Sequence, residues 1–271
     1  MLPPEKNLEV RSQRPTRSNG RPPLLFVHGG YCDAWCWDRY FLPWFAAQGY
    51  AAHALSLRGH GASGGRETLF VAGIEDYAAD VERVAATLPS APVLIGHSMG
   101  ASVVEHLLVN RPVRAAALLA PVPPAGLGPI AGRLLALQPE YLVHLHRLDA
   151  PHLAGDVLAA LRPLYFSDDV APDVLAEAMF HITAESPRAI LDLTLRWHSS
   201  RAGVEITPFV LAAAGDRVST VADARATAEL YGTEATVVPR LAHMMMLERR
   251  WETAAKLLLQ WLERDVRSAP R

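Results

Sequence analysis

The most constraining feature of the sequence is a series of short, wholly apolar runs that alternate with longer stretches of helical period. Such runs are buried on both faces when they lie in a parallel sheet covered by helices. The alternation therefore predicts an α/β fold with a mostly parallel central sheet, right-handed crossovers and helices on both faces. The runs expected to be strands are 24–27, 51–57, 93–95, 115–120, 208–214 and 235–238. The stretches expected to be helices are 37–48, 76–88, 99–110, 220–230 and 250–263.

This alternation is interrupted once, between Ala120 and Pro208, where Leu- and Ala-rich amphipathic segments follow one another without a strand-like run. Prolines and glycines at the start of this stretch and near its end favour irregular connections to the sheet. We therefore expect residues 1–121 and 204–271 to form the core domain, and residues 122–203 to form a helical cap inserted into it.

Composition excludes several classes of protein. The chain has 271 residues, half of them hydrophobic, and can bury the core of one domain with an insertion. Its 26 Lys and Arg against 28 Asp and Glu give a formal charge of -2 without a basic stripe, so we expect no nucleic-acid partner.

The N-terminal residues and the two cysteines bear on the compartment. Residues 1–21 are polar and rich in Pro and Arg, and no run has the roughly 18 apolar residues of a membrane span. Cys32 and Cys36 lie too close together in the sequence for a framework disulfide and are expected to be free thiols. These features favour a cytoplasmic protein that does not bind a membrane.

The strongest chemical motif is Gly-His-Ser-Met-Gly at 96–100, which lies between an expected strand and an expected helix. A nucleophile on such a sharp strand-to-helix turn has a strained backbone, and Gly96 and Gly100 would let strand and helix pass closely. The order strand, G-x-S-x-G, helix predicts that Ser98 is a catalytic nucleophile. The alternative is an ordinary glycine-rich turn.

A serine hydroxyl is a weak nucleophile, so it needs an imidazole to take its proton and a carboxylate to orient that imidazole. His243 follows the last expected strand and precedes the final helix, and Asp216 follows the strand at 208–214. Both positions fall where catalytic groups gather in open α/β sheets. We expect His243 to be the base and Asp216 the acid, with Asp223 as a weaker substitute; His28 and His97 are expected to brace loops.

Acyl transfer also needs backbone donors for the oxyanion. The glycine-rich turn after residues 24–27 offers the N–H of Gly30, and Met99, directly after the expected nucleophile, offers the second. Gly29 and Gly30 could also make only a tight turn. No metal site is expected, because His144 and His146 would project to nearly opposite sides of a helix and no zinc-type spacing is present.

The expected pocket is apolar, so we expect a small-molecule substrate, specifically an apolar or aromatic ester. Tyr31, Met244, Tyr141 and Phe166 are the main candidates for its lining, although such residues can equally be core. Further candidates are Met99, Met245, Met246, Leu134, Leu135, Leu137, Leu142, Tyr165 and Phe180.

Together, the motifs His28-Gly29-Gly30, Arg58-Gly59-His60-Gly61, Gly96 to Gly100, Gly215-Asp216 and His243 resemble the α/β-hydrolase superfamily over about residues 24–262. The resemblance implies a Ser-His-Asp hydrolase that needs no cofactor, with a helical cap inserted after the sixth strand. The run from Gly29 to Trp37 is similar to the corresponding turn of plant methylesterases and hydroxynitrile lyases.

Two departures from relatives narrow the expected activity. Ser56 stands where many relatives carry Asp, and the glycine turn lacks the H-G-G-P-G form of proline iminopeptidases, which disfavours peptidase activity. Haloalkane dehalogenases and epoxide hydrolases of this fold need an Asp nucleophile, and Ser98 occupies that position.

The leading hypothesis is therefore a carboxylesterase that works through an acyl-enzyme on Ser98. A second hypothesis keeps the scaffold but assigns cofactor-free oxygenation, perhydrolysis or cyanohydrin cleavage. A third assigns a non-catalytic ligand-binding protein. The sequence does not identify the acyl group or the alcohol, because fold and triad leave specificity to the cap. The oligomeric state is also left open.

Overall fold

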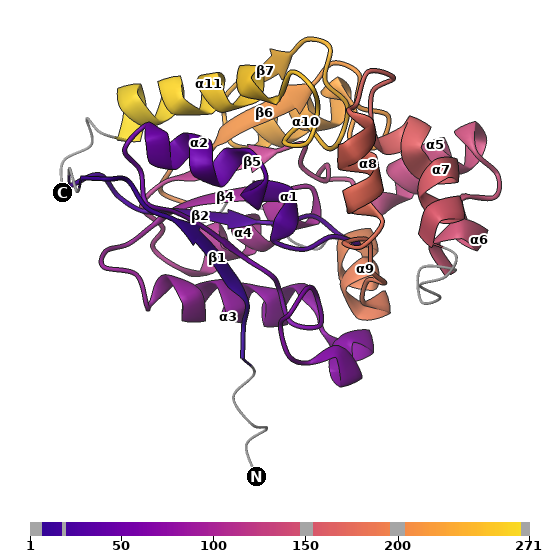
Figure 1. The fold of residues 1–271 in the computed structure, drawn as a ribbon, viewed down its shortest axis with the longest axis horizontal. Coiled ribbons are helices and arrows are strands. Elements are labelled where there is room, and N and C mark those ends of the chain that lie inside the picture. Colours follow the sequence, from indigo (N-terminus) through magenta and orange to yellow (C-terminus); the bar gives the residue numbers. More distant parts are fainter. Residues whose placement is uncertain (1–6, 18–19, 147–153, 196–203, 267–271) are drawn as a thin grey trace.

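A seven-stranded sheet forms the centre of the protein, in the order β1-β3-β2-β4-β5-β6-β7 (Figure 1). The computed structural model describes residues 7–17, 20–146, 154–195 and 204–266. All neighbouring strands pair in parallel except β1 and β3, which confirms the mostly parallel sheet. The strands are β1 (Val10–Gln13), β2 (Leu24–Val27), β3 (Ala52–Leu55), β4 (Val93–His97), β5 (Ala116–Leu119), β6 (Phe209–Ala213) and β7 (Ala235–Val238).

Strand β1 was not predicted, and its composition explains why. Its sequence is Val-Arg-Ser-Gln, and most of it is exposed. As an edge strand it pairs only with β3, antiparallel, with Val10 opposite Leu55. A polar edge strand has no buried face, so it carries neither an apolar run nor an apolar alternation.

Side chains of the inner strands alternate between two buried cores. In β2, Leu24 and Phe26 belong to one core, and Leu25 and Val27 belong to the other. Helices α1, α2 and α11 cover the first face, and α3, α4 and α10 cover the second (Figure 1). These helices are α1 (Trp35–Asp38), α2 (Phe41–Ala47), α3 (Ile74–Ala85), α4 (Met99–Asn110), α10 (Val221–Leu230) and α11 (Trp251–Trp261), which continues into the π-helical stretch η4 (Leu262–Val266).

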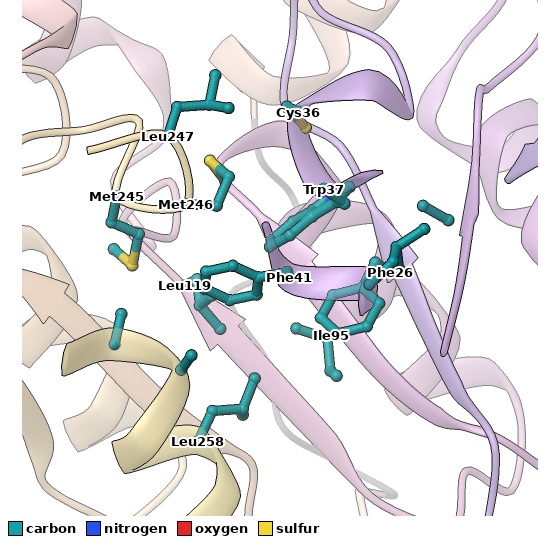
Figure 2. Close-up of a cluster of buried hydrophobic side chains, with 14 of the residues drawn as sticks. Phe26, Cys36, Trp37, Phe41, Ile95, Leu119, Met245, Met246, Leu247 and Leu258 are labelled. Carbon is teal, nitrogen blue, oxygen red and sulfur yellow. The ribbon is translucent and has the colours of Figure 1, made fainter. Parts of the chain in front are cut away.

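Figure 2 shows part of the first core, where aromatic rings from β2, α1 and α2 meet. The ring centroids of Phe26 and Trp37 lie 4.9 Å apart, and those of Trp37 and Phe41 lie 5.4 Å apart. Cys36 packs in the same cluster, and both cysteines are buried free thiols, as predicted. Aromatic packing of this kind fixes α1 against the sheet, and with it the loop that connects β2 to α1.

The single helix expected at 37–48 is two helices in the structure, α1 and α2, and this prediction was wrong. Pro43 lies in the first turn of α2. A continuous helix would need a proton donor at this position, bonded to the carbonyl of residue 39, and proline has no N–H. A second helix that begins at Phe41 places the proline where an N–H has no intrahelical partner.

Helices α5 to α9 follow one another between β5 and β6 and gather beyond one side of the sheet (Figure 1). They are α5 (Leu127–Leu137), α6 (Tyr141–His146), α7 (Ala154–Tyr165), α8 (Pro172–Ala178) and α9 (Pro187–Leu195). Part of this segment packs around its own apolar core, which includes Ile130, Leu134, Val157 and Leu161.

This helical segment lies at the expected place along the chain but follows the fifth strand, not the sixth. The physical reason is the short N-terminal part of the sheet. Among the described residues before β2, only β1 pairs with the sheet, so β5 is the fifth strand in chain order.

The turn from β4 into α4 brings three backbone segments into contact. A Cβ atom on Gly96 would overlap the backbone of Gly100, and a Cβ atom on Gly100 would overlap the carbonyl groups of Val27 and His28. Since backbone atoms cannot move aside as a flexible side chain can, only glycine fits at these two positions. The close approach places the start of α4 next to the end of β2.

Replacing Gly100 by alanine should therefore destabilise the protein by about 3 kcal/mol, because the added methyl group forces β2 and α4 apart. The matched control is Gly132→Ala, in the interior of α5, where an added Cβ meets nothing within 4 Å. That substitution should stabilise the protein by roughly 0.5–1 kcal/mol through lower chain entropy. Urea unfolding measures both; equal midpoints for the two variants would contradict the close packing.

Candidate active site

Ser98 connects β4 to α4 in a strained conformation. Its backbone angles are φ 52° and ψ −118°, in a region that residues with a side chain rarely adopt. The Ser98 amide donates to the Leu119 carbonyl at 2.9 Å, and the Ser98 carbonyl accepts from the Ala101 amide at 3.0 Å. These bonds hold the strained residue between strand and helix, and its side chain lines a cavity.

The strand order explains why a cavity opens at this place. From β2 the chain continues to β3 on one side of β2, whereas β4 lies on the other side. The connections after β2 and β4 therefore run in opposite directions, which leaves a crevice at the carboxyl ends of these strands. Gly30 follows β2 and Ser98 follows β4, and both line the cavity.

His243 and Asp216 form a buried pair. Nδ1 of His243 donates to Oδ2 of Asp216 at 2.8 Å, and the two residues are 2% and 6% exposed. Oδ1 of Asp216 accepts from the backbone N–H groups of Val218 and Ser219 at 2.8 and 2.9 Å. The carboxylate is thus held on one side by backbone donors and orients the imidazole with its other oxygen. Because Nδ1 carries the proton in the neutral ring, Nε2 is left as the acceptor.

Asp223, the weaker substitute, has a different role in the structure. Its Oδ2 accepts from the Thr220 amide at 2.9 Å and so caps α10, and it also forms an ion pair with Arg133 at 2.6 Å. Asp216, not Asp223, is therefore the partner of His243.

His97 contacts the backbone and the ring of the catalytic candidate His243. Its Nε2 donates to the His243 carbonyl at 2.9 Å, and the two ring centroids lie 4.7 Å apart. Burial, and after it the neighbouring His243, holds the pKa of His97 well below its usual value, so the ring is neutral. His97 therefore braces the loop that carries His243, as the sequence suggested.

His28 braces the turn after β2. Its Nε2 accepts from the Leu57 amide at 3.0 Å, and its Nδ1 donates to the Gly29 carbonyl at 2.8 Å. Burial, followed by the charge of His60, lowers the pKa of His28 to about 4, which keeps the ring neutral. The hydrogen bond from the Leu57 amide to His28 connects the turn after β2 to the segment that follows β3.

The two expected oxyanion donors lie together. Gly30 and Met99 line the same cavity as Ser98, and a Cβ on Gly30 would lie 3.8 Å from the Met99 sulfur. Met99 is the first residue of α4, where a backbone N–H has no acceptor within the helix. The positive end of the α4 dipole is directed to the same place.

The cavity has a volume of about 290 Å³ and is lined mainly by apolar side chains. The four main candidates, Tyr31, Met244, Tyr141 and Phe166, all line it. Met99, Leu134 and Tyr165 also line it.

Several other pocket candidates lie elsewhere. Met245 and Met246 are fully buried in the core between the sheet and its helices (Figure 2). Leu137 and Phe180 are 54% and 81% exposed. Composition does not encode whether an apolar side chain points into the cavity, into the core or to the surface. The side chain of Leu142 lies outside the described residues.

Paired hydroxyl groups form a polar spot in this apolar cavity. The hydroxyls of Tyr141 and Tyr165 lie 2.7 Å apart, and the Tyr165 ring centroid lies 5.6 Å from that of His243. Burial, and then the nearby Tyr141, raises the pKa of Tyr165 well above its usual value, so this hydroxyl stays protonated. Sequence reasoning identified the two rings as lining but missed the hydroxyl pair, because the two tyrosines meet only when α6 packs on α7.

Sequence reasoning also missed Glu185, which reaches the turn after β2 from the loop between α8 and α9. A Cβ on Gly30 would lie 3.5 Å from its Oε2. No local pattern marks this residue, since a single Glu in a polar loop is normally solvated.

Across the described parts of the chain, no group of three or more His, Cys, Asp or Glu residues is placed to hold a metal ion. Within the same residues, no helix is long and apolar enough to cross a membrane.

The chain is similar to several known proteins in sequence and in fold. A pyrethroid hydrolase from Sphingobium wenxiniae is 30% identical over 96 residues, which cover 35% of this chain and 34% of that protein. The match thus spans about a third of the length of this curated relative.

Among solved structures, a thermophilic esterase from Thermogutta terrifontis superposes with a TM-score of 0.74 at 20% identity, over 97% of this chain and 95% of that chain. An enol-lactonase from Burkholderia xenovorans also gives 0.74, at 19% identity, over 95% and 97% of the two chains. At such identities these likenesses show the fold. The family model described as "Alpha/beta hydrolase family" matches residues 24–257. Because this match covers most of the chain and the fold agrees along nearly its whole length, the protein belongs to the alpha/beta hydrolase family.

Proposed function

We propose that this protein is a serine hydrolase that cleaves carboxylic esters of apolar or aromatic small molecules through an acyl-enzyme. The observation that carries the proposal is one cavity lined by both a strained serine, Ser98, and an imidazole, His243, whose Nδ1 is held by the buried Asp216. This combination provides a nucleophile, a base and an orienting acid. The mechanism needs no cofactor.

In the proposed reaction, Oγ of Ser98 attacks the ester carbonyl carbon while Nε2 of His243 takes the hydroxyl proton. The carbonyl oxygen becomes an oxyanion that accepts hydrogen bonds from the amides of Gly30 and Met99. The tetrahedral intermediate then collapses, the bond to the alcohol breaks, and His243 returns the proton to the leaving oxygen. Water repeats the sequence on the acyl-enzyme, which releases the acid and restores Ser98.

The lining and the size of the cavity support this substrate class. An apolar lining stabilises hydrocarbon and aromatic groups by removing them from water, and 290 Å³ is the size of a small-molecule site. Helices α5 to α9 supply much of the lining, and we assign them the role of a cap that sets specificity. The pyrethroid hydrolase and the esterase among the related proteins are consistent with a hydrolase that acts on esters.

The first test is covalent labelling. Treatment with a fluorophosphonate should add the mass of one probe less HF to the wild-type protein, because Oγ of Ser98 displaces fluoride from phosphorus, and Ser98→Ala should remove both labelling and hydrolysis of p-nitrophenyl butyrate. The matched control is Ser102→Ala, one turn further along α4, which removes a buried hydroxyl with no hydrogen-bond partner among the described residues. Ser102→Ala should label as the wild type does. Intact-mass spectrometry reads out both variants.

A folded wild-type protein that takes up no probe would contradict the activated serine. Ester turnover that survives Ser98→Ala would point to a reaction on the same scaffold without an acyl-enzyme. Retention of an apolar ligand without turnover of any ester would indicate a binding protein.

The acid can be tested with two aspartates that follow the same strand. Asp216→Asn should lower kcat by roughly 10³- to 10⁴-fold, because an amide no longer holds His243 in the reactive tautomer. Asp223→Asn should change kcat by less than about threefold, since Asp223 only caps α10 and pairs with Arg133. Steady-state kinetics on one ester compares them. The pairing would have no catalytic meaning if Asp216→Asn kept more than a tenth of the activity.

The apolar cavity predicts how activity depends on acyl length. From p-nitrophenyl acetate to hexanoate, kcat/KM should rise by about fourfold per added methylene, the rate equivalent of about 0.8 kcal/mol per buried CH₂ group. A flat series would mean that the acyl chain lies outside the cavity.

A further inference from the structure

Residues 181–186 lie in the connection between α8 and α9 and cross the turn after β2. The Thr183 amide donates to the Tyr31 carbonyl at 3.2 Å, and the Tyr31 amide donates to Oε2 of Glu185 at 3.3 Å. Two residues further on, Asp33 accepts from Nδ1 of His181 at 2.8 Å. Both polar backbone groups of Tyr31 are therefore bonded to the helical segment, not to the sheet.

Tyr31 needs such support because its φ angle is 62°, in the left-handed region. A residue with a side chain is strained in this region, because its Cβ comes too close to the backbone. Its neighbour Gly30, the proposed oxyanion donor, has no side chain to restrict its own backbone. Fixing the Tyr31 N–H fixes the peptide plane that follows Gly30, and so limits where the Gly30 N–H can point.

The group that fixes this plane is a fully buried carboxylate. Oε1 of Glu185 accepts from the Tyr77 hydroxyl at 2.6 Å and from the Ser186 amide at 2.7 Å. Oε2 accepts from Nε2 of His60 at 3.1 Å as well as from the Tyr31 amide. Neither the His60 nor the Glu185 side chain is exposed to solvent. With four donors around it, the carboxylate has one defined orientation.

His60 provides the counter-charge. Its Nδ1 faces the Arg58 carbonyl at 3.1 Å and its Nε2 faces Glu185, so both ring nitrogens donate and the ring is an imidazolium. Burial by itself would lower the pKa of His60, but the Glu185 charge and these hydrogen bonds raise it above its usual value. Burial would likewise raise the pKa of Glu185, but His60 and the other donors hold it below its usual value.

The other groups that face this pair do not replace either partner. The rings of His28 and Tyr77 lie 5.1 and 5.9 Å from the His60 ring, centroid to centroid. His28 is neutral, and burial raises the pKa of Tyr77, so that ring is neutral too. Arg66 opposes the charge of His60 from a distance. The proton on His60 is therefore the one that balances Glu185.

We propose that Glu185 is a positioning residue for the turn after β2, here called the oxyanion turn because it carries Gly30. Its ion pair with His60 keeps this turn in the conformation in which the Gly30 N–H can donate to the oxyanion. The proposal rests on the proposed serine-hydrolase function. Through Glu185 the helical segment contributes a side chain that holds the oxyanion turn. If His60 lost its proton, the negative charge of Glu185 would no longer be balanced. It would then repel the oxyanion that forms on the substrate, and the activation barrier of acylation would rise.

The sign of the pH effect follows from the pair. Glu185 stays ionised above the usual carboxyl range, and its stabilising contribution is lost as pH falls through its lowered pKa. The contribution of His60 is complete below the usual histidine pKa of about 6.5 and is lost as pH rises through its raised pKa. Wild-type kcat should therefore fall on the alkaline side, with a limb that belongs to His60.

The decisive variant is Glu185→Gln, which keeps the side-chain shape but removes the charge. We expect kcat and the rate constant for labelling of Ser98 by fluorophosphonate to fall roughly 10- to 100-fold, as for a misplaced catalytic group. KM should stay within about threefold of wild type, because the cavity walls are unchanged. The alkaline limb that belongs to His60 should disappear.

The matched control is Asp192→Asn in α9. Oδ2 of Asp192 accepts from the Ile74 amide at 3.1 Å and so docks the same helical segment on α3, away from the turn. If Glu185 only attached the segment, both variants would lower the melting temperature and neither would slow labelling selectively. Equal labelling rates for Glu185→Gln and Asp192→Asn would therefore overturn the proposal.

A measurement on the wild-type protein covers the case in which Glu185→Gln does not fold. In ¹⁵N-labelled protein, the Tyr31 amide signal should shift with the same midpoint as the His60 imidazole nitrogens, since both bond to Oε2 of Glu185. A Tyr31 amide that ignores the titration of His60 would overturn the proposal. This measurement needs no turnover, so it tests the coupling of Tyr31 to the Glu185–His60 pair separately from the labelling of Ser98, which tests the proposed function.

Discussion

The structure depends on one close approach of backbone segments, where the end of β4 and the start of α4 pass against the end of β2. Gly96 and Gly100 permit it because any Cβ at these positions would overlap backbone atoms. The approach holds Ser98 at φ 52° and brings Met99, the first residue of α4, to the same cavity as Gly30. The positions of the proposed nucleophile and of both proposed oxyanion donors therefore follow from a single packing constraint between elements that the buried sheet makes rigid.

Two buried carboxylates, those of Asp216 and Glu185, hold different parts of the candidate site around Ser98. Asp216 uses one oxygen to bind backbone amides and the other to orient the ring of His243. Glu185 binds a charged ring, His60, and a backbone amide of the oxyanion turn. A buried anion is costly unless it is paired and hydrogen-bonded, and each of these is both. The first carboxylate comes from the sheet and the second from the helical segment, so the site is assembled from both parts of the chain.

The fold could be predicted from the sequence to a large extent because burial leaves a local record. Strands buried on both faces are apolar throughout, and β2 and β7 begin and end where their runs do. The exposed edge strand β1 left no such record, and the expected single helix at 37–48 is divided into α1 and α2, with Pro43 in the first turn of α2. For the candidate site, Ser98, His243 and Asp216 stood out because each follows a strand at the carboxyl edge of the sheet. Which aspartate binds His243 was settled by geometry.

What the sequence by itself determined is the sheet, the serine at its sharp turn and the order in which the proposed nucleophile, acid and base follow along the chain, since these depend on short patterns next to strands. Only the tertiary structure decided the cavity lining, the hydroxyl pair of Tyr141 and Tyr165, and the ion pair of Glu185 with His60. Glu185 lies 125 residues from His60 along the chain. A contact between such distant residues depends on how the helical segment packs on the sheet, and no local pattern encodes that packing.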